Sequence, residues 1–166
     1  MKTLVRFLVW IALVVWLGGL LYFPVVAASS FGTIADTHVA GTIVAKCLVT
    51  LHHEGLFAGC WIVLFLLLGI ALRVYGRSMI IGVIVTLVMF GFTAYSQFSI
   101  IPRMEHDRIA AGGAIDAVPH TNPLHADFDR LHVRSEHVEE VVMLAGLLLV
   151  ILLARDIGPD VLQRRP

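Results

Sequence analysis

The chain has 166 residues, of which 58 % are hydrophobic, and its mean hydropathy of +0.89 is far above that of soluble domains. Its twelve Lys and Arg residues balance twelve Asp and Glu residues, and no basic stripe indicates nucleic acid binding. This composition excludes an ordinary soluble domain and predicts an integral membrane protein embedded in the lipid bilayer.

Four apolar segments are candidate transmembrane helices. A helix crosses the hydrocarbon core of a bilayer, about 30 Å thick, with about 20 residues. The predicted crossings are residues 4–28, 51–72, 79–101 and 132–154. The first also resembles a secretory signal, but its long apolar core leads us to expect a retained helix. The predicted fold is an all-α integral membrane protein, a single domain over residues 1–166 that forms a four-transmembrane-helix bundle.

The segment before the second crossing has a helical pattern of its own. His38, Thr42, Lys46 and Thr50 recur at every fourth position, and the opposite side is apolar. This pattern predicts an amphipathic helical extension before the second helix. The extension either lies in the outer interface or continues into the crossing as one long helix. The polar side of this extension either faces water at the interface or lines a groove together with the fourth helix.

An outer loop is expected at residues 102–126, because a Gly pair, an Asn and Pro residues interrupt the apolar pattern. Pro102 is expected to end the third helix or to follow its last turn. His106, His120 and His125 lie in this loop. Scattered loop histidines are usually solvated, and a ligand role is the alternative.

The distribution of charge predicts the orientation of the chain. With a cytoplasmic N-terminus, four crossings place seven of the twelve Lys and Arg residues inside, whereas ten of the twelve acids and all eight His lie outside. The positive-inside rule therefore predicts a multi-pass protein of the cell (inner) membrane with both termini cytoplasmic. The acidic, His-bearing outer face suits cations.

Ionisable residues continue into the fourth crossing. The sequence LHVRSEHVEEVV, residues 131–142, precedes an apolar run that is too short to cross a bilayer alone. The helix must therefore include part of this charged segment. His132, Glu136 and Glu140 lie at successive fourth positions and share one face, on which His and Glu heads can converge on a cation. Such residues are costly within a membrane unless they face a site or a partner charge.

The HHE sequence at the entrance of the second helix offers further ligands. If the second and fourth helices are neighbours, the candidate set for a divalent or soft metal ion is His52, His53, Glu54, His132, Glu136, Glu139 and Glu140. Two alternatives stay open. One is axial ligation of haem or chlorophyll by His52, His53, His132 or His137. The other is a charge-paired helix seam without a ligand, in which the acids are neutralised by Lys46, Arg103, Arg130 and Arg134.

Short motifs spread over residues 10–154 carry a family resemblance. They are WLGGLLYF in the first helix, AGTIVAKCL and LHHEGLFAG around the second, IIPRME after the third and FDRLHVRS opening the fourth. The order of these motifs resembles the transmembrane protein 205-like family, which includes bacterial members described only as a domain of unknown function. The matching positions are Trp16, Gly19, Gly41, His52 or His53, Gly55, Pro102, Met104, Glu105, Phe128, His132 and Ser135.

The resemblance implies a four-helix membrane protein without an established reaction, and the association of vertebrate members with tolerance of platinum drugs implies metal-related traffic. The chain departs from the family at EHVEE, residues 136–140, so the resemblance does not support the carboxylate ligands.

Three functional hypotheses follow from these patterns. The first is a small membrane protein that handles or transports a metal or another cation. The second is an accessory subunit of a respiratory or photosynthetic complex that binds haem, chlorophyll or lipid, and the third is a structural bundle. No GxSxG, P-loop or dinucleotide motif is present, so we do not expect an enzyme. Small residues such as Gly18 and Gly19 favour a homo-oligomer or a larger membrane complex.

Overall fold

The computed structural model describes residues 1–156, which form helices and short connections without any strand. Four helical segments are long and apolar enough to cross a membrane, which confirms the predicted all-α four-helix bundle. In chain order the elements are α1 (Lys2–Thr33), α2 (Thr37–Ala71), η1 (Arg77–Met79), α3 (Ile80–Tyr95), the π-helical turn η2 (Ser96–Ile100), α4 (Ile101–Ala110), η3 (Ile115–Ala117) and α5 (Pro123–Asp156).

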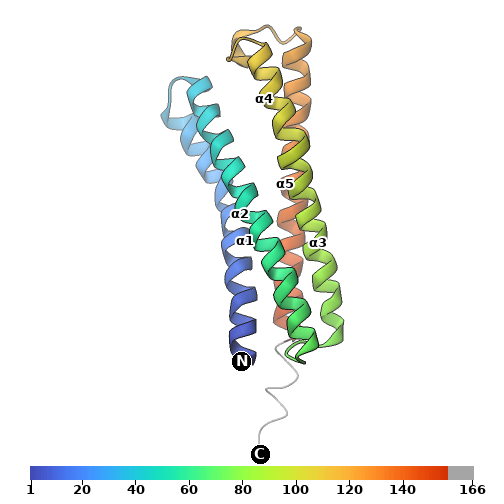
Figure 1. The fold of residues 1–166 in the computed structure, drawn as a ribbon. Coiled ribbons are helices and arrows are strands. Elements are labelled where there is room, and N and C mark those ends of the chain that lie inside the picture. The colour runs from blue at the N-terminus through green and yellow to red at the C-terminus, as the bar shows by residue number, and fades with distance from the viewer. Residues whose placement is uncertain (157–166) are drawn as a thin grey trace, which may run out of the picture.

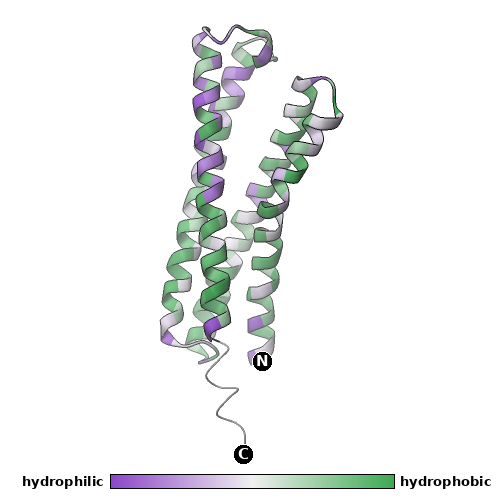
Figure 2. Ribbon diagram, turned by 180° about the vertical axis from the view of Figure 1, so that it is seen from behind, coloured by the Kyte–Doolittle hydropathy of each residue, from purple (hydrophilic) through white to green (hydrophobic). Residues whose placement is uncertain are grey.

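The helices run up and down along one axis (Figure 1). Helix α1 packs on α2, α2 on α3 and α3 on α5, and a smaller contact between α1 and α5 closes the bundle. The start of α1, the α2–α3 connection and the end of α5 lie at one end, called here the termini end. The α1–α2 and α4–α5 connections lie at the opposite, loop end, where hydrophilic residues are concentrated on α4 and α5 (Figure 2).

Helix α2 is continuous from its amphipathic part through the second crossing. The Asp36 carboxylate caps it by accepting hydrogen bonds from the backbone N–H groups of His38 and Val39, at 2.9 and 3.1 Å. Of the two expected arrangements, the structure therefore has one long helix. Part of its polar side faces α4, because Arg108 donates a 2.8 Å hydrogen bond to the Thr42 hydroxyl.

The third crossing is longer than expected, and the outer loop is correspondingly shorter. Helix α4 occupies the first part of the loop predicted at residues 102–126, and α5 begins at Pro123, which leaves residues 111–122 as the connection. The prediction that Pro102 ends the helix or follows its last turn was wrong. Pro102 lies in the first turn of α4, where a missing backbone N–H is tolerated, directly after the π-helical turn.

The centre of the bundle is organised around Trp16 of α1, which is 1 % exposed. Its indole lies against α2 at Gly55, where a Cβ atom would be only 2.3 Å from Trp16 Nε1. A Cβ atom at Gly59 would lie 3.2 Å from the same ring. The two glycines thus form the flat surface on which the largest buried side chain packs.

Polar contacts join three segments at the termini end. Arg6 donates a 3.0 Å hydrogen bond to the Val74 carbonyl and lies 3.9 Å from the Asp156 carboxylate. Asp156 also accepts a 3.2 Å hydrogen bond from the Gly76 N–H. The Arg6 guanidinium lies 5.6 Å from the centre of the Tyr75 ring. These contacts link α1, the α2–α3 connection and α5.

Tyr75 makes this end of the bundle sensitive to alkaline pH. Its side chain is buried, its hydroxyl has no hydrogen-bond partner among the described residues, and burial raises the pKa of Tyr75 from 10.0 to about 12. The folded state therefore holds this proton more tightly than the unfolded state, and the free energy of unfolding falls as pH rises from 10.0 towards about 12. We expect Tyr75→Phe to flatten this decline in denaturant titrations of detergent-solubilised protein. Equal slopes for the wild type and the variant would contradict the assignment.

Candidate functional site

A buried histidine on α2 joins three helical elements. His52 is 1 % exposed, and its two ring nitrogens contact different partners. Nε2 lies 2.6 Å from Oε1 of Glu139 on α5, and Nδ1 lies 3.0 Å from Oε1 of Gln97 in η2. We call His52, Glu139 and Gln97 the His52 network. It lies within helices that are long and apolar enough to cross a membrane.

The short contact between His52 and Glu139 requires a proton between the two atoms, since a bare nitrogen lone pair and a carboxylate oxygen would repel each other. Gln97 Oε1 faces Nδ1 and accepts a hydrogen bond from it. The Glu139 contact is therefore imidazolium with carboxylate, neutral imidazole with carboxylic acid, or, with the Gln97 amide turned to donate to Nδ1, neutral imidazole donating from Nε2 to carboxylate. In each state a proton lies between Nε2 and Oε1 at a buried position.

The π-helical turn brings Gln97 into this network. A π turn contains one residue more than an α turn and rotates the side chains that follow it, and such turns are frequent at functional sites. The η2 turn ends with a hydrogen bond from the Ile101 N–H to the Ser96 carbonyl. Gln97 and Ser96 thus occupy positions that an uninterrupted α-helix would orient differently.

Several buried oxygen atoms in this region have no hydrogen-bond partner. Among the described residues, Glu139 Oε2 is buried and accepts no hydrogen bond. The hydroxyls of Thr93 in α3 and of Ser96, which precedes Gln97 in η2, are also buried without hydrogen-bond partners. Buried polar atoms are usually paired, so these three unpaired oxygen atoms need an explanation.

The two ends of the His52 network differ in polarity. On the termini side, the turn of α2 after His52 carries Gly55 and the Trp16 indole, and beyond them a large apolar cluster fills the bundle. On the loop side lie a small buried cluster of Ile100, Leu131 and Val138 and the end of the large cluster, which includes Leu20 and Leu51. The loop side of the network therefore has less buried apolar packing than the termini side.

The other predicted site residues lie apart from this network. His53, Glu54 and Glu140 are exposed. His132 and Glu136 form an exposed pair within α5, with 3.4 Å between Nε2 and Oε1. Within residues 1–156, the seven predicted metal ligands contain no group of three that converges as a metal site requires. The structure thus joins His52 with Glu139 and, separately, His132 with Glu136.

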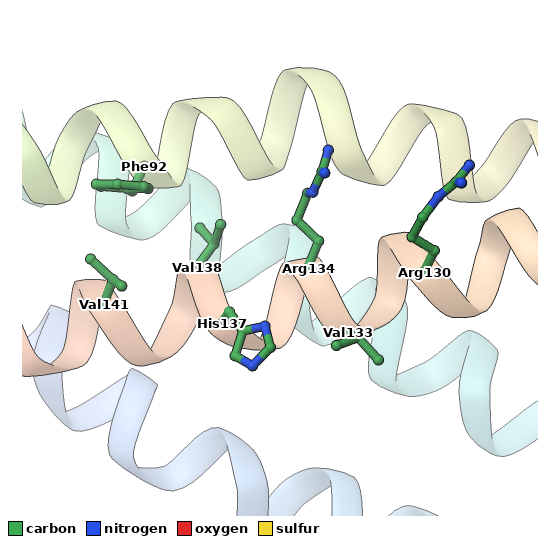
Figure 3. Close-up of a pocket in the computed structure, with 7 residues that line it drawn as sticks. All are labelled: Phe92, Arg130, Val133, Arg134, His137, Val138 and Val141. Carbon is green, nitrogen blue, oxygen red and sulfur yellow. The ribbon is translucent and has the colours of Figure 1, made fainter.

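His137 lies at a shallow groove beside α5 (Figure 3). The groove has a volume of about 280 Å³, and its lining is mainly apolar apart from His137 and two arginines. The side chains of Arg130 and Arg134 point towards the neighbouring helical segment of α3 and α4, whereas His137 points to the other side of α5. Arg134 lies 3.4 Å from the Tyr95 hydroxyl, and Arg130 contacts Asp127. Neither arginine forms an ion pair with Glu136, Glu139 or Glu140 among the described contacts.

The geometry also limits the alternative of axial haem or chlorophyll ligation. Both ring nitrogens of His52 are engaged, so ligation by His52 would break a hydrogen bond to Gln97 or Glu139. His53, His132 and His137 are exposed, which leaves no buried pair of ring nitrogens among these four predicted ligands in the described chain.

Sequence reasoning missed Gln97 as a member of the site. Its neighbours form an apolar third helix, and no local pattern distinguishes it from a lipid-exposed glutamine. It also missed His125, expected to be solvated, which is buried with only 5 % exposure. The one group of three potential metal ligands that converges within residues 1–156 is His120, His125 and Asp129.

Comparisons with protein-family models, curated proteins and solved structures give no match. The resemblance to the transmembrane protein 205-like family therefore stays a prediction.

Proposed function

We propose that the chain is a cation-handling membrane protein whose intramembrane His52–Glu139 pair binds and releases a proton. The observation that carries the proposal is the 2.6 Å contact between the two side chains, at a histidine that is 1 % exposed. Ionisable residues inside a membrane are expensive and commonly mark sites of proton or ion movement. The unpaired Glu139 Oε2 gives the pair a free acceptor for an incoming proton or cation.

The proton exchanges with water at the loop end. The apolar cluster around Trp16 blocks the other direction within the described bundle, so one chain binds a proton but does not conduct it across. Transport would require a second conformation or an assembly of several chains, and such an assembly is part of the proposal. The polar loop end and the unpaired oxygens support this direction of access.

The loop end faces away from the cytoplasm in this proposal, as the positive-inside rule predicts. Cysteine introduced at the exposed last residue of α4, as Ala110→Cys, reports this orientation in intact cells. Reaction with a membrane-impermeant maleimide supports an outer loop end. If the cysteine reacts with the maleimide only after the membrane is permeabilised, the loop end faces the cytoplasm and the proposed orientation is wrong.

The proton site is tested by infrared spectroscopy of the purified protein recorded over the pH range in which it remains folded. We expect a carboxyl band that changes with pH in the wild type and is absent in Glu139→Gln. Glu136→Gln serves as the control, because Glu136 is exposed and pairs only with His132. An unchanged band in Glu139→Gln, or no pH response of the Glu139 carboxyl, would remove the proton-binding function and leave a charge-paired structural seam.

A further inference from the structure

A second group of ionisable side chains lies at the loop end, between the α4–α5 connection and the start of α5. His120 comes from the connection, and His125 and Asp129 lie one turn apart on α5. Each offers one ligand atom, and these atoms all lie within 4.8 Å of one another. The group is formed by residues outside the His52 network.

The distances suit a metal ion of the transition series. Asp129 Oδ2 lies 3.7 Å from His125 Nε2 and 3.8 Å from His120 Nδ1. In a tetrahedral site with metal–ligand bonds of about 2.1 Å, ligand atoms are about 3.4 Å apart. Contraction by a few tenths of an ångström would bring each histidine nitrogen to that spacing from Asp129. The two histidine ligand atoms lie within 4.8 Å of each other, and movement of the exposed His120 closes this gap.

The His125 ring is held as a ligand would need to be. It is 5 % exposed, and its Nδ1 donates a 2.8 Å hydrogen bond to the Val118 carbonyl. In the neutral imidazole this leaves Nε2 without a proton, and its lone pair is directed towards Asp129. A backbone carbonyl that fixes the tautomer and orientation of a ligating histidine is a common feature of metal sites.

The backbone around His120 is set by the His125 bond to Val118 and by turns that do not involve the side chains of His120 and Asp129. The Asn122 N–H donates a 2.8 Å hydrogen bond to the Pro119 carbonyl. The Asn122 side chain accepts a 2.9 Å hydrogen bond from the Leu124 N–H at the start of α5. His120 therefore sits in a closed turn directly before the helix, and its ring centre lies 4.1 Å from that of His125.

We infer that His120, His125 and Asp129 bind a divalent transition-metal ion of the Zn²⁺ class. Two imidazoles and one carboxylate favour such ions over Mg²⁺ and Ca²⁺, which prefer oxygen ligands. Three protein ligands leave a coordination position for water or an external ligand. The exposure of the His120 and Asp129 side chains, 85 % and 58 %, places that position at the surface of the loop end.

The test is calorimetric titration of the full chain with Zn²⁺, after purification through a tag without histidine. Co²⁺ absorbance reports the coordination independently. We expect one equivalent of Zn²⁺ to bind the wild type, and His120→Ala and Asp129→Asn to weaken binding by at least about 10-fold, since loss of even a supporting partner costs about 10- to 100-fold. His120→Ala is informative because that exposed side chain makes no hydrogen bond on which the described fold depends.

His132→Ala is the matched control, because His132 and Glu136 have the same spacing on α5 without a third ligand. It should bind Zn²⁺ as the wild type does, and so should Glu139→Gln, which separates this site from the proposed proton site. Absence of Zn²⁺ binding in the wild type would overturn the inference and leave an ion pair of protonated His125 with Asp129. Binding that His120→Ala and Asp129→Asn leave unchanged would also overturn it.

Discussion

Replacing His52 with Ala is expected to lower the free energy of unfolding by about 3–5 kcal/mol, the range found when one partner of a buried ion pair is removed. The replacement removes the imidazole partner of Glu139, whose Oε2 is already buried without a hydrogen bond, and removes the contact of Gln97 with Nδ1. It also opens a cavity at a fully buried position. Denaturant titration in a defined detergent, followed by circular dichroism, measures the loss.

The double variant His52→Leu, Glu139→Leu is expected to recover most of that loss. Buried ion pairs replaced by apolar residues of similar volume are often as stable as the original. His132→Ala is the control, because it breaks an exposed pair whose contribution should stay below about 1 kcal/mol. A double variant as unstable as His52→Ala would show that the pair is needed for the stability of the fold. A stable double variant that lacks the pH-dependent carboxyl band fits a functional pair.

Gly55→Ala is expected to lower the free energy of unfolding by about 1–3 kcal/mol, the usual cost of overpacking a buried site. The new Cβ would lie 2.3 Å from Trp16 Nε1, and Trp16 is 1 % exposed, so the indole cannot move into free space. Because Gly55 lies one turn from His52 on α2, we also expect the shift of α1 against α2 to disturb the His52 network. Thermal unfolding in detergent gives the size of the effect.

Gly18→Ala is the matched control for this variant. Gly18 also lies within a membrane helix, but a Cβ there meets nothing within 4 Å. Since Ala is a better helix former than Gly, this control should be neutral or slightly stabilising. If Gly55→Ala proves as stable as Gly18→Ala, Trp16 is not packed against α2 as described.

Hydropathy predicted the fold well because lipid imposes a simple rule on every crossing. Each backbone group must be paired within its own helix, so length and apolar composition identify the spans. The ends of the helices were less predictable. The amphipathic pattern predicted the extension of α2, which begins at Thr37. Helix α5, however, begins at Pro123, inside the loop expected at residues 102–126, because polar residues continue a helix once its caps and neighbours stabilise it.

Only part of the site could be predicted from the sequence. Charge at the apolar spans placed His52 and Glu139 among seven candidate ligands, and the structure joins these two at 2.6 Å. Helical periodicity grouped Glu136 with Glu140 instead, because it describes one helix and not the contacts between helices. Gln97 depends on a π-helical turn with no known local signal here, and the grouping of His120 with Asp129 depends on how the connection folds back onto α5.

The central claim is that the His52–Glu139 pair holds an exchangeable proton, and ¹⁵N NMR of the His52 imidazole across pH tests it most directly. We predict that the Nε2 resonance, which reports the contact with Glu139, moves with pH in the wild type. In Glu139→Gln the course of this titration should change, whereas Glu136→Gln should leave it as in the wild type. A His52 resonance that stays fixed throughout the range in which the protein remains folded would contradict the account.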